Sequence, residues 1–279
     1  MDRLLPVLLW AVAILVSLVI AIVIAVVIVE AMPALRHIGV TRFLTDESWH
    51  PTTDLFNLWP MVVGTFLVTL GALLLSATLG LMSAIFCCFY APRPVGAAYA
   101  RVVELLAGIP SVVYGFWGLV VLVPIVGRLA QPGTSLLAAI IVLAMMVLPT
   151  ISMVATVSLR AVPADLVLGA HALGLSRRSL IVKVVVPAAR RGLATSIVLG
   201  AGRALGETMA VLMVSGNVVQ IPSSVFDPVR TLAANIALEI AYAGDFHRST
   251  LFVSGLALTL MVLATVCVAE AVGPDRRHD

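Results

Sequence analysis

Six long apolar runs constrain what this chain can fold into. A helix needs about 20 apolar residues to cross the hydrocarbon core of a bilayer, where its backbone groups must be hydrogen-bonded within the segment. The runs lie at about Pro6–Val29, Met61–Phe89, Leu105–Val126, Ser135–Leu159, Leu193–Ser215 and Leu251–Val272. Charged residues make up only 11% of the chain, against about 25% in an average soluble domain. We therefore predict an all-α integral membrane protein with six spanning helices.

The runs also predict the organisation and orientation of the chain. We expect residues 1–60 to hold an N-terminal transmembrane helix and an outer loop, and residues 61–272 to form a core transmembrane domain. A cytoplasmic loop is expected at about 160–192 and a cytoplasmic tail at 273–279. With the N-terminus inside, the cytoplasmic segments carry eleven arginines and lysines and the outer segments five, so both termini are predicted to be cytoplasmic. The first run exceeds the 7–15 apolar residues typical of a signal peptide, and we expect it to be retained as a helix.

Arg203 and Glu207 lie in the middle of the fifth run. A charge at that depth costs roughly 3 kcal/mol, so intramembrane ionisable residues usually mark a functional path. On one helix, residues four apart share a face and can partly neutralise each other; the alternative interpretation is a structural ion pair between helices. Thr208, Tyr114 and Ser111 are weaker candidates, able to donate hydrogen bonds to an anion, although Ser and Thr in spans more often bond to their own backbone.

A short cytoplasmic helix is predicted at Ala164–Leu175, between the fourth and fifth runs. Apolar residues recur there at helical spacing, at Leu166, Ala170 and Leu173. Such a helix can insert its apolar face into a groove on a partner protein.

Other residues near the spans have less specific roles. Pro110 and Pro149 can kink helices, either as hinges or as fixed bends that shape packing. Glu104 and Glu270 lie near span ends, where a long side chain reaches the interface, and we expect interfacial or structural roles for them.

Four ordered motifs carry a family resemblance. Gly169–Gly174, followed by Val184, Val186 and Pro187, resembles the EAA loop of ABC-importer permeases. The other three motifs are Gly108–Gly115, Gly202–Val211 and Thr231–Glu239. From Phe56 onward the chain resembles the PstC family, the C-type permease subunits of high-affinity phosphate importers. The resemblance implies a six-helix, type I ABC importer permease bundle in the bacterial cytoplasmic (inner) membrane.

The resemblance assigns two sets of site residues. The expected substrate path contains Arg203, Glu207 and Thr208. The expected ATPase-coupling residues are Leu166, Gly169, Ala170, His171, Leu173 and Gly174. The chain departs from the EAA pattern at Leu168, which replaces the glutamate that helps to dock the loop on the ATPase, and at Gly169, which replaces an alanine. His171 is expected to be an ordinary contact rather than a pH switch or metal ligand.

The sequence and the resemblance together predict the partners. No GxxxxGK[ST] phosphate-binding loop occurs in the chain, so we expect a transport subunit without enzymatic activity. The implied partners are a second, PstA-like permease subunit, a PstB-like ATPase dimer that binds ATP and Mg²⁺, an external PstS-like phosphate-binding protein, and membrane lipid. No nucleic-acid partner is expected, because base-contacting motifs are absent. The three cysteines lie inside predicted spans, so no disulfide framework or metal site is expected.

Two alternatives remain open at this point. The chain can be a permease for another oxyanion, such as sulfate or molybdate, since one arginine does not distinguish among such anions. It can also be a membrane sensor scaffold that reports anion status without transporting. ATP-dependent uptake separates the sensor from the permeases, and competition among oxyanions separates the two permeases.

Overall fold

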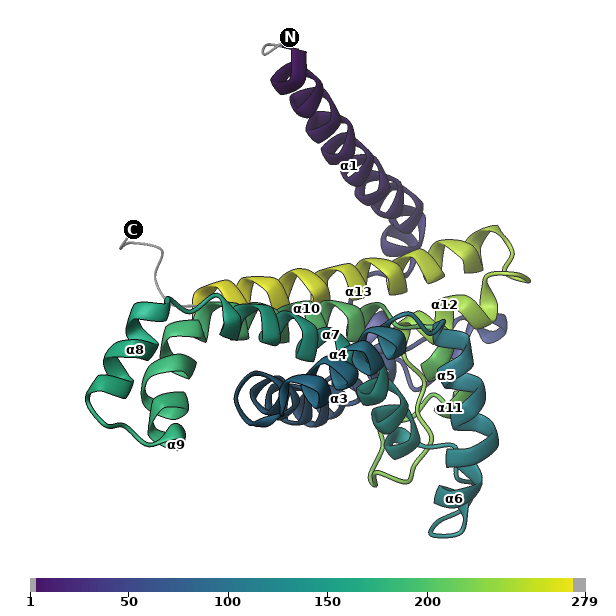
Figure 1. The fold of residues 1–279 in the computed structure, drawn as a ribbon. Coiled ribbons are helices and arrows are strands. Elements are labelled where there is room, and N and C mark those ends of the chain that lie inside the picture. The colour runs from purple at the N-terminus through teal and green to yellow at the C-terminus, as the bar shows by residue number, and fades with distance from the viewer. Residues whose placement is uncertain (1–3, 273–279) are drawn as a thin grey trace.

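The computed structural model describes residues 4–272 and is almost entirely helical (Figure 1). The helices are α1 (Leu4–Ile38), α2 (Arg42–Thr45), α3 (Trp59–Ile85), α4 (Arg93–Ala107), α5 (Ser111–Trp117), α6 (Val123–Gly127), α7 (Leu136–Arg160), α8 (Ala164–Ala172), α9 (Arg177–Leu180), α10 (Val186–Gly206), α11 (Met209–Val214), α12 (Leu232–Glu239) and α13 (Asp245–Val272). Three π-helical turns continue these helices, namely η2 (Phe86–Tyr90), η3 (Gly118–Leu122) and η4 (Ile181–Val185). A short antiparallel hairpin, β1 (Trp49–His50) and β2 (Leu55–Phe56), flanks the 3-10 turn η1 (Pro51–Thr53).

The helices confirm the predicted fold class. Within residues 4–272, five helices are long and apolar enough to cross a membrane, or six if the bent pair α4 and α5 forms one span. The first helix continues to Ile38, beyond the predicted end at Val29. Residues 5–26 are exposed, and Figure 1 shows this part of α1 projecting away from the other helices.

Helix α7 lies at the centre of the largest apolar cluster. It begins at a cap in which Ser135 Oγ accepts a hydrogen bond from the backbone N–H of Ala138. Ile151 is fully buried and lies against Gly80 of α3 and Gly200 of α10. A Cβ at Gly200 would stand 2.8 Å from the end of the Ile151 side chain, so the absence of side chains at these two positions allows α3 and α10 to approach α7 closely. Pro149 lies inside α7, which stays one helix through it.

Two smaller clusters fix the ends of the molecule. One joins the C-terminal part of α1 to the hairpin, α12 and the start of α13, around Phe56, Met61 and Leu251. The other packs α8 against η4 and the C-terminal end of α7, around Leu159 and Val185. The chain therefore has one separate apolar cluster beneath the hairpin and another beneath α8.

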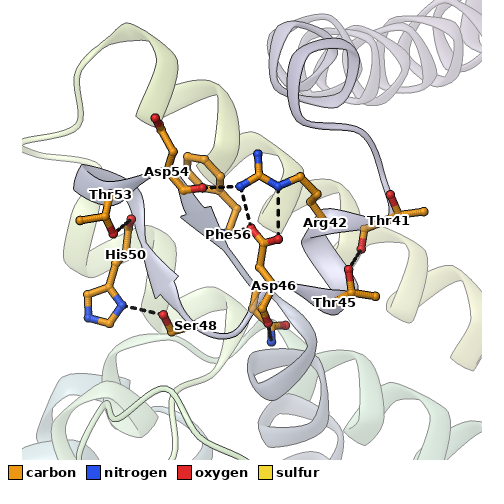
Figure 2. Close-up of polar contacts among 10 residues, drawn as sticks. Thr41, Arg42, Thr45, Asp46, Ser48, His50, Thr53, Asp54 and Phe56 are labelled. Atoms are coloured by element: carbon orange, nitrogen blue, oxygen red, sulfur yellow. Dashed lines mark hydrogen bonds and ion pairs between the residues drawn. The ribbon is translucent and has the colours of Figure 1, made fainter.

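Charged side chains hold the hairpin loop, residues 39–58, in shape (Figure 2). Arg42 Nη2 donates to Asp46 Oδ2 at 3.1 Å, and the same nitrogen donates to the backbone carbonyl of Asp54. Asp46 Oδ2 also accepts from the backbone N–H of Phe56 at 2.9 Å. Partial burial raises the pKa of Asp46, but the hydrogen bonds from Phe56 and Arg42 and the charge of Arg42 lower it further, so its pKa lies below the usual value.

Two predicted spans are not single helices. The third is broken between α4 and α5, which meet at 93°, because Pro110 cannot continue a helix and biases the residue before it away from helical geometry. The fifth helical run begins at Arg177 instead of Leu193, passes through η4, and ends at Gly206 instead of Ser215. Much of the predicted basic loop is therefore helical, and the end of the predicted span becomes the separate helix α11.

Candidate functional site

The candidate site forms where α10 ends. Arg203 lies in the last turn of α10, and its side chain is exposed in the isolated chain. Glu207 follows the helix with an extended backbone, ψ 125°, and its side chain is half-buried. The helix thus stops between the two residues, so the prediction that they share one helix face is wrong. Within residues 4–272, the structure shows no ion pair between them.

Glu207 instead bonds to the first turn of α11, which begins at Met209. The Oε1 atom of Glu207 accepts a hydrogen bond from the backbone N–H of Ala210 at 3.1 Å, which satisfies one of the unpaired donors of the first helical turn. Thr208 is half-buried, and its Oγ1 lies 3.4 Å from the carbonyl oxygen of Gly206. The three predicted path residues therefore lie together at one helix break, with Arg203 on one side and Glu207 and Thr208 on the other.

A second helix break lies beside the first. The Tyr114 side chain is buried, and its hydroxyl donates to the carbonyl oxygen of Leu106 at 2.9 Å, across the bend between α4 and α5. The hydroxyl proton, which the sequence analysis considered as a hydrogen-bond donor to an anion, is therefore used within the chain. Ser111, another weak candidate, is the half-buried first residue of α5.

Helices α5 and α11 approach each other closely at Gly115. A Cβ at this position would stand 2.8 Å from Ala210 Cα and 2.9 Å from Met213 Sδ. Both distances are shorter than an ordinary contact. The two short helices that follow the two breaks are therefore packed backbone to backbone, which fixes the position of α11 relative to α5.

One side of the site is open. A Cβ added at Gly202 or Gly206 would meet no atom within 4 Å, and Arg203 between them is exposed. This face of α10 leaves the guanidinium accessible from outside the chain. The arginine can thus meet an anion or a second protein that covers this face.

The predicted coupling helix is present as α8, residues Ala164–Ala172. It ends in a Schellman cap, in which the N–H of Gly174 donates to the carbonyl of His171 and the N–H of Leu175 to that of Ala170. Gly174 has φ +71°, a conformation that favours glycine. This geometry explains why the segment has a glycine at position 174.

The predicted coupling face divides into an outer and an inner part. Leu166 is 48% exposed and Leu173 is 83% exposed, whereas Ala170 is buried against the end of α7 and η4. Ala170 therefore packs inside this chain, contrary to the prediction that it faces a partner. Gly169 and His171 are exposed. A partner at this end of the molecule would meet the leucines.

The structure locates the remaining candidates as follows. Glu104 is exposed on α4, as an interfacial role requires. The side chain of Glu270 lies outside the described part of the chain. Cys87, Cys88 and Cys267 are all free thiols. No group of three His, Cys, Asp or Glu side chains among residues 4–272 is arranged to hold a metal ion.

One polar cluster was missed at the level of sequence. Glu239 is buried and lies within hydrogen-bonding distance of Trp49, Arg230 and His247. The Thr231–Glu239 motif pointed to the segment but not to these contacts, since Trp49 is 190 residues away. Hydropathy carries no signal for such a pairing.

Comparison with known proteins gives a consistent result. The family model "Binding-protein-dependent transport system inner membrane component" matches residues 76–278. A probable ABC transporter permease protein, YqgH of Bacillus subtilis, is 41% identical over 241 residues, covering 84% of this chain and 78% of the relative. The phosphate transport system permease protein PstC of Mesorhizobium japonicum is 36% identical over 250 residues, covering 82% and 76% respectively.

The fold is also found among solved structures. An inward-facing structure of the MetNI methionine ABC transporter superposes with a TM-score of 0.59 at 17% identity, covering 80% of this chain and 97% of that chain. At this level of identity the likeness concerns the fold alone. It supports the arrangement of helices around α7 described above.

Proposed function

Because the chain belongs to the family of binding-protein-dependent transport system inner membrane components, we propose that it is the permease subunit of an ATP-driven phosphate importer. It is a multi-pass membrane protein and a transport subunit rather than an enzyme. The family works with an ATPase and a binding protein. The relatives named as phosphate permeases support phosphate as the transported anion.

The observation that carries the proposal is the placement of Arg203. Its guanidinium lies in the last turn of α10, on a face that the chain leaves open, beside the break between α10 and α11. A positive charge inside a membrane protein offsets the hydration that an anion loses on entry. The guanidinium fork also matches two oxygens of a phosphate group. This arrangement suits an anion path formed between this chain and a second permease.

Glu207 provides for release of the anion. A path must bind its ion strongly enough for entry but weakly enough for exit. Glu207 lies just beyond the end of α10, and its carboxylate bonds to the start of α11. We infer that a movement at this break brings the carboxylate towards Arg203, where it competes with the phosphate for the guanidinium and repels the departing anion.

The partners are assigned by the same reasoning. A PstA-like permease would cover the open face of α10, a PstB-like ATPase dimer carrying ATP and Mg²⁺ would contact the exposed leucines of α8, and a PstS-like protein would deliver phosphate from the opposite side. Both termini would lie in the cytoplasm, as the distribution of basic residues predicts. Closure of the ATPase dimer would then move the helices through α8.

Reconstitution of the complete complex tests the proposal. ATP-dependent phosphate uptake is expected, with competition by arsenate and little competition by sulfate. Arg203→Gln should abolish uptake without preventing assembly, and Arg203→Lys should restore little, because an ammonium keeps the charge but lacks the fork. Arg128→Gln, at an exposed arginine beyond the end of α6, is the matched control and should leave uptake unchanged.

Two results would contradict the proposal. Uptake of sulfate but not phosphate would assign the chain to another oxyanion, and an assembled complex without ATP-dependent uptake would favour a sensor. A double variant, Arg203→Met with Glu207→Leu, addresses the assigned residues. Normal phosphate uptake by this variant would show that the two charges serve structure alone.

A further inference from the structure

The Thr231–Glu239 motif forms a buried polar cluster that the anion path does not use. Thr231 caps α12, and Glu239 is its last residue, with 7% of its surface exposed. Arg230 Nη1 donates to Glu239 Oε1 at 2.7 Å, and Trp49 Nε1 donates to Oε2 at 2.9 Å. His247 Nε2 lies 2.9 Å from the same Oε2. The carboxylate thus joins the hairpin, the 215–231 segment and the start of α13.

Hydrogen bonds lead from this cluster towards the candidate site. Arg230 Nε donates to the backbone carbonyl of Asn217 at 2.9 Å. The Asn217 side chain in turn donates from Nδ2 to the carbonyl of Leu212 at 2.8 Å. Leu212 belongs to α11, the helix whose first turn is held by Glu207. A continuous set of contacts therefore connects Glu239 with the helix that begins at the anion path.

Helix α11 depends on such contacts for its position. A helix of six residues is far too short to be stable by itself, so neighbouring groups must hold it. Gly115 of α5 contacts its side, and Asn217 holds the carbonyl of Leu212 near its end. Arg230 is mostly buried, with 19% of its side chain exposed, and Glu239 supplies its counter-charge. Neutralising Glu239 would leave the Arg230 guanidinium without its counter-charge and weaken its hydrogen bond to the carbonyl of Asn217.

We propose that Glu239 is a positioning residue for transport, which through Arg230 and Asn217 holds α11 where Glu207 and Arg203 can act on the anion. Trp49 connects the same carboxylate to the hairpin, so Glu239 is bonded both to the hairpin and, through Arg230, to the segment that holds α11. This inference rests on the transport function proposed above. It assigns a role to a motif that contributes nothing to the path directly.

The test uses the reconstituted complex and two variants that cut the connection at different points. Glu239→Gln removes the charge with little change of shape. Asn217→Gly removes the donor to Leu212 and suits the φ of +54° at this position. Each should lower the maximal rate of phosphate uptake by about tenfold, with little change in the phosphate concentration for half-maximal rate. Because both act through one connection, the double variant should be no slower than the slower single variant.

A reporter on α11 gives a readout that does not depend on transport. Met209 is 43% exposed, and Met209→Cys in a chain whose native cysteines are replaced allows the rate of thiol modification to be measured. Glu239→Gln and Asn217→Gly should each change this rate severalfold. Arg128→Gln is the control, because it also removes a charge but lies at an exposed position beyond the end of α6, outside these contacts; it should change neither the modification rate nor the uptake rate.

The outcomes separate this inference from the proposed function. If the wild-type complex fails to transport phosphate while Glu239→Gln still alters thiol modification, the transport function is wrong and the positioning of α11 stands. Unchanged modification and uptake in Glu239→Gln would overturn the positioning role. Rate losses that multiply in the double variant would also overturn it. If Glu239→Gln does not assemble, Asn217→Gly decides alone, since it leaves the Arg230–Glu239 pair intact.

Discussion

Replacing Gly115 by alanine should separate α5 from α11 and impair transport. The new Cβ would stand 2.8 Å from Ala210 Cα and 2.9 Å from Met213 Sδ. Carbon atoms in contact prefer about 3.5–4.0 Å, so the helices must part by roughly 1 Å. The Met213 side chain can turn away, but the backbone of Ala210 cannot. Overpacking of this kind costs about 1–3 kcal/mol, and we expect the complex to remain assembled with a melting temperature several degrees lower.

The functional effect should exceed the loss of stability. Ala210 donates the hydrogen bond that holds Glu207, so a displacement of α11 moves the carboxylate away from its place beside the end of α10. Phosphate uptake by proteoliposomes should therefore fall severely at a temperature where the complex remains folded. Gly244→Ala is the control, because a Cβ there would meet no atom within 4 Å. Wild-type uptake and melting temperature in Gly115→Ala would refute the close packing of α5 and α11.

Three further predictions follow from other parts of the chain. Leu173→Asp should prevent docking of the ATPase, because a charge buried without a partner costs about 3–5 kcal/mol; co-purification measures this, and retention of the ATPase would exclude the α8 contact. An impermeant thiol reagent added to intact cells should label Thr52→Cys but not Ala172→Cys, and the reverse pattern would overturn the orientation. The pKa of Asp46 is lower in the folded protein than its usual value near 3.8, so the ionised carboxylate stabilises the fold. This stabilisation is complete above the usual pKa and is lost as the pH falls through the lower pKa of the folded state. The melting temperatures of wild type and Asp46→Asn should therefore differ at pH 7 and converge on acidification, and a difference that persists in acid would contradict the role of the carboxylate.

The sequence predicted the features that depend on local composition. The apolar runs located the long helices α1, α3, α7 and α13, because a segment that must hydrogen-bond internally in lipid has few alternatives to a helix. Spacing of apolar residues and Gly174 located the short helix α8. The motif resemblance pointed to the correct family, and its path residues Arg203, Glu207 and Thr208 lie together at one helix break.

The tertiary structure decided the features that depend on distant neighbours. Apolar residues lie on both sides of Gly206 and Glu207, so hydropathy could not reveal that the helix stops there and that Glu207 bonds to Ala210 instead of pairing with Arg203. It also could not show which side of α8 packs inward, because the inward position of Ala170 depends on α7 and η4.

The contacts of Glu239 show the same distinction. A window of sequence identified its helix, but its bonds come from Trp49 and from segments before and after α12. Apolar burial is largely a property of each segment and can be predicted locally. A buried charge is tolerated only with specific partners in specific places, and these are brought together only when the whole chain has folded.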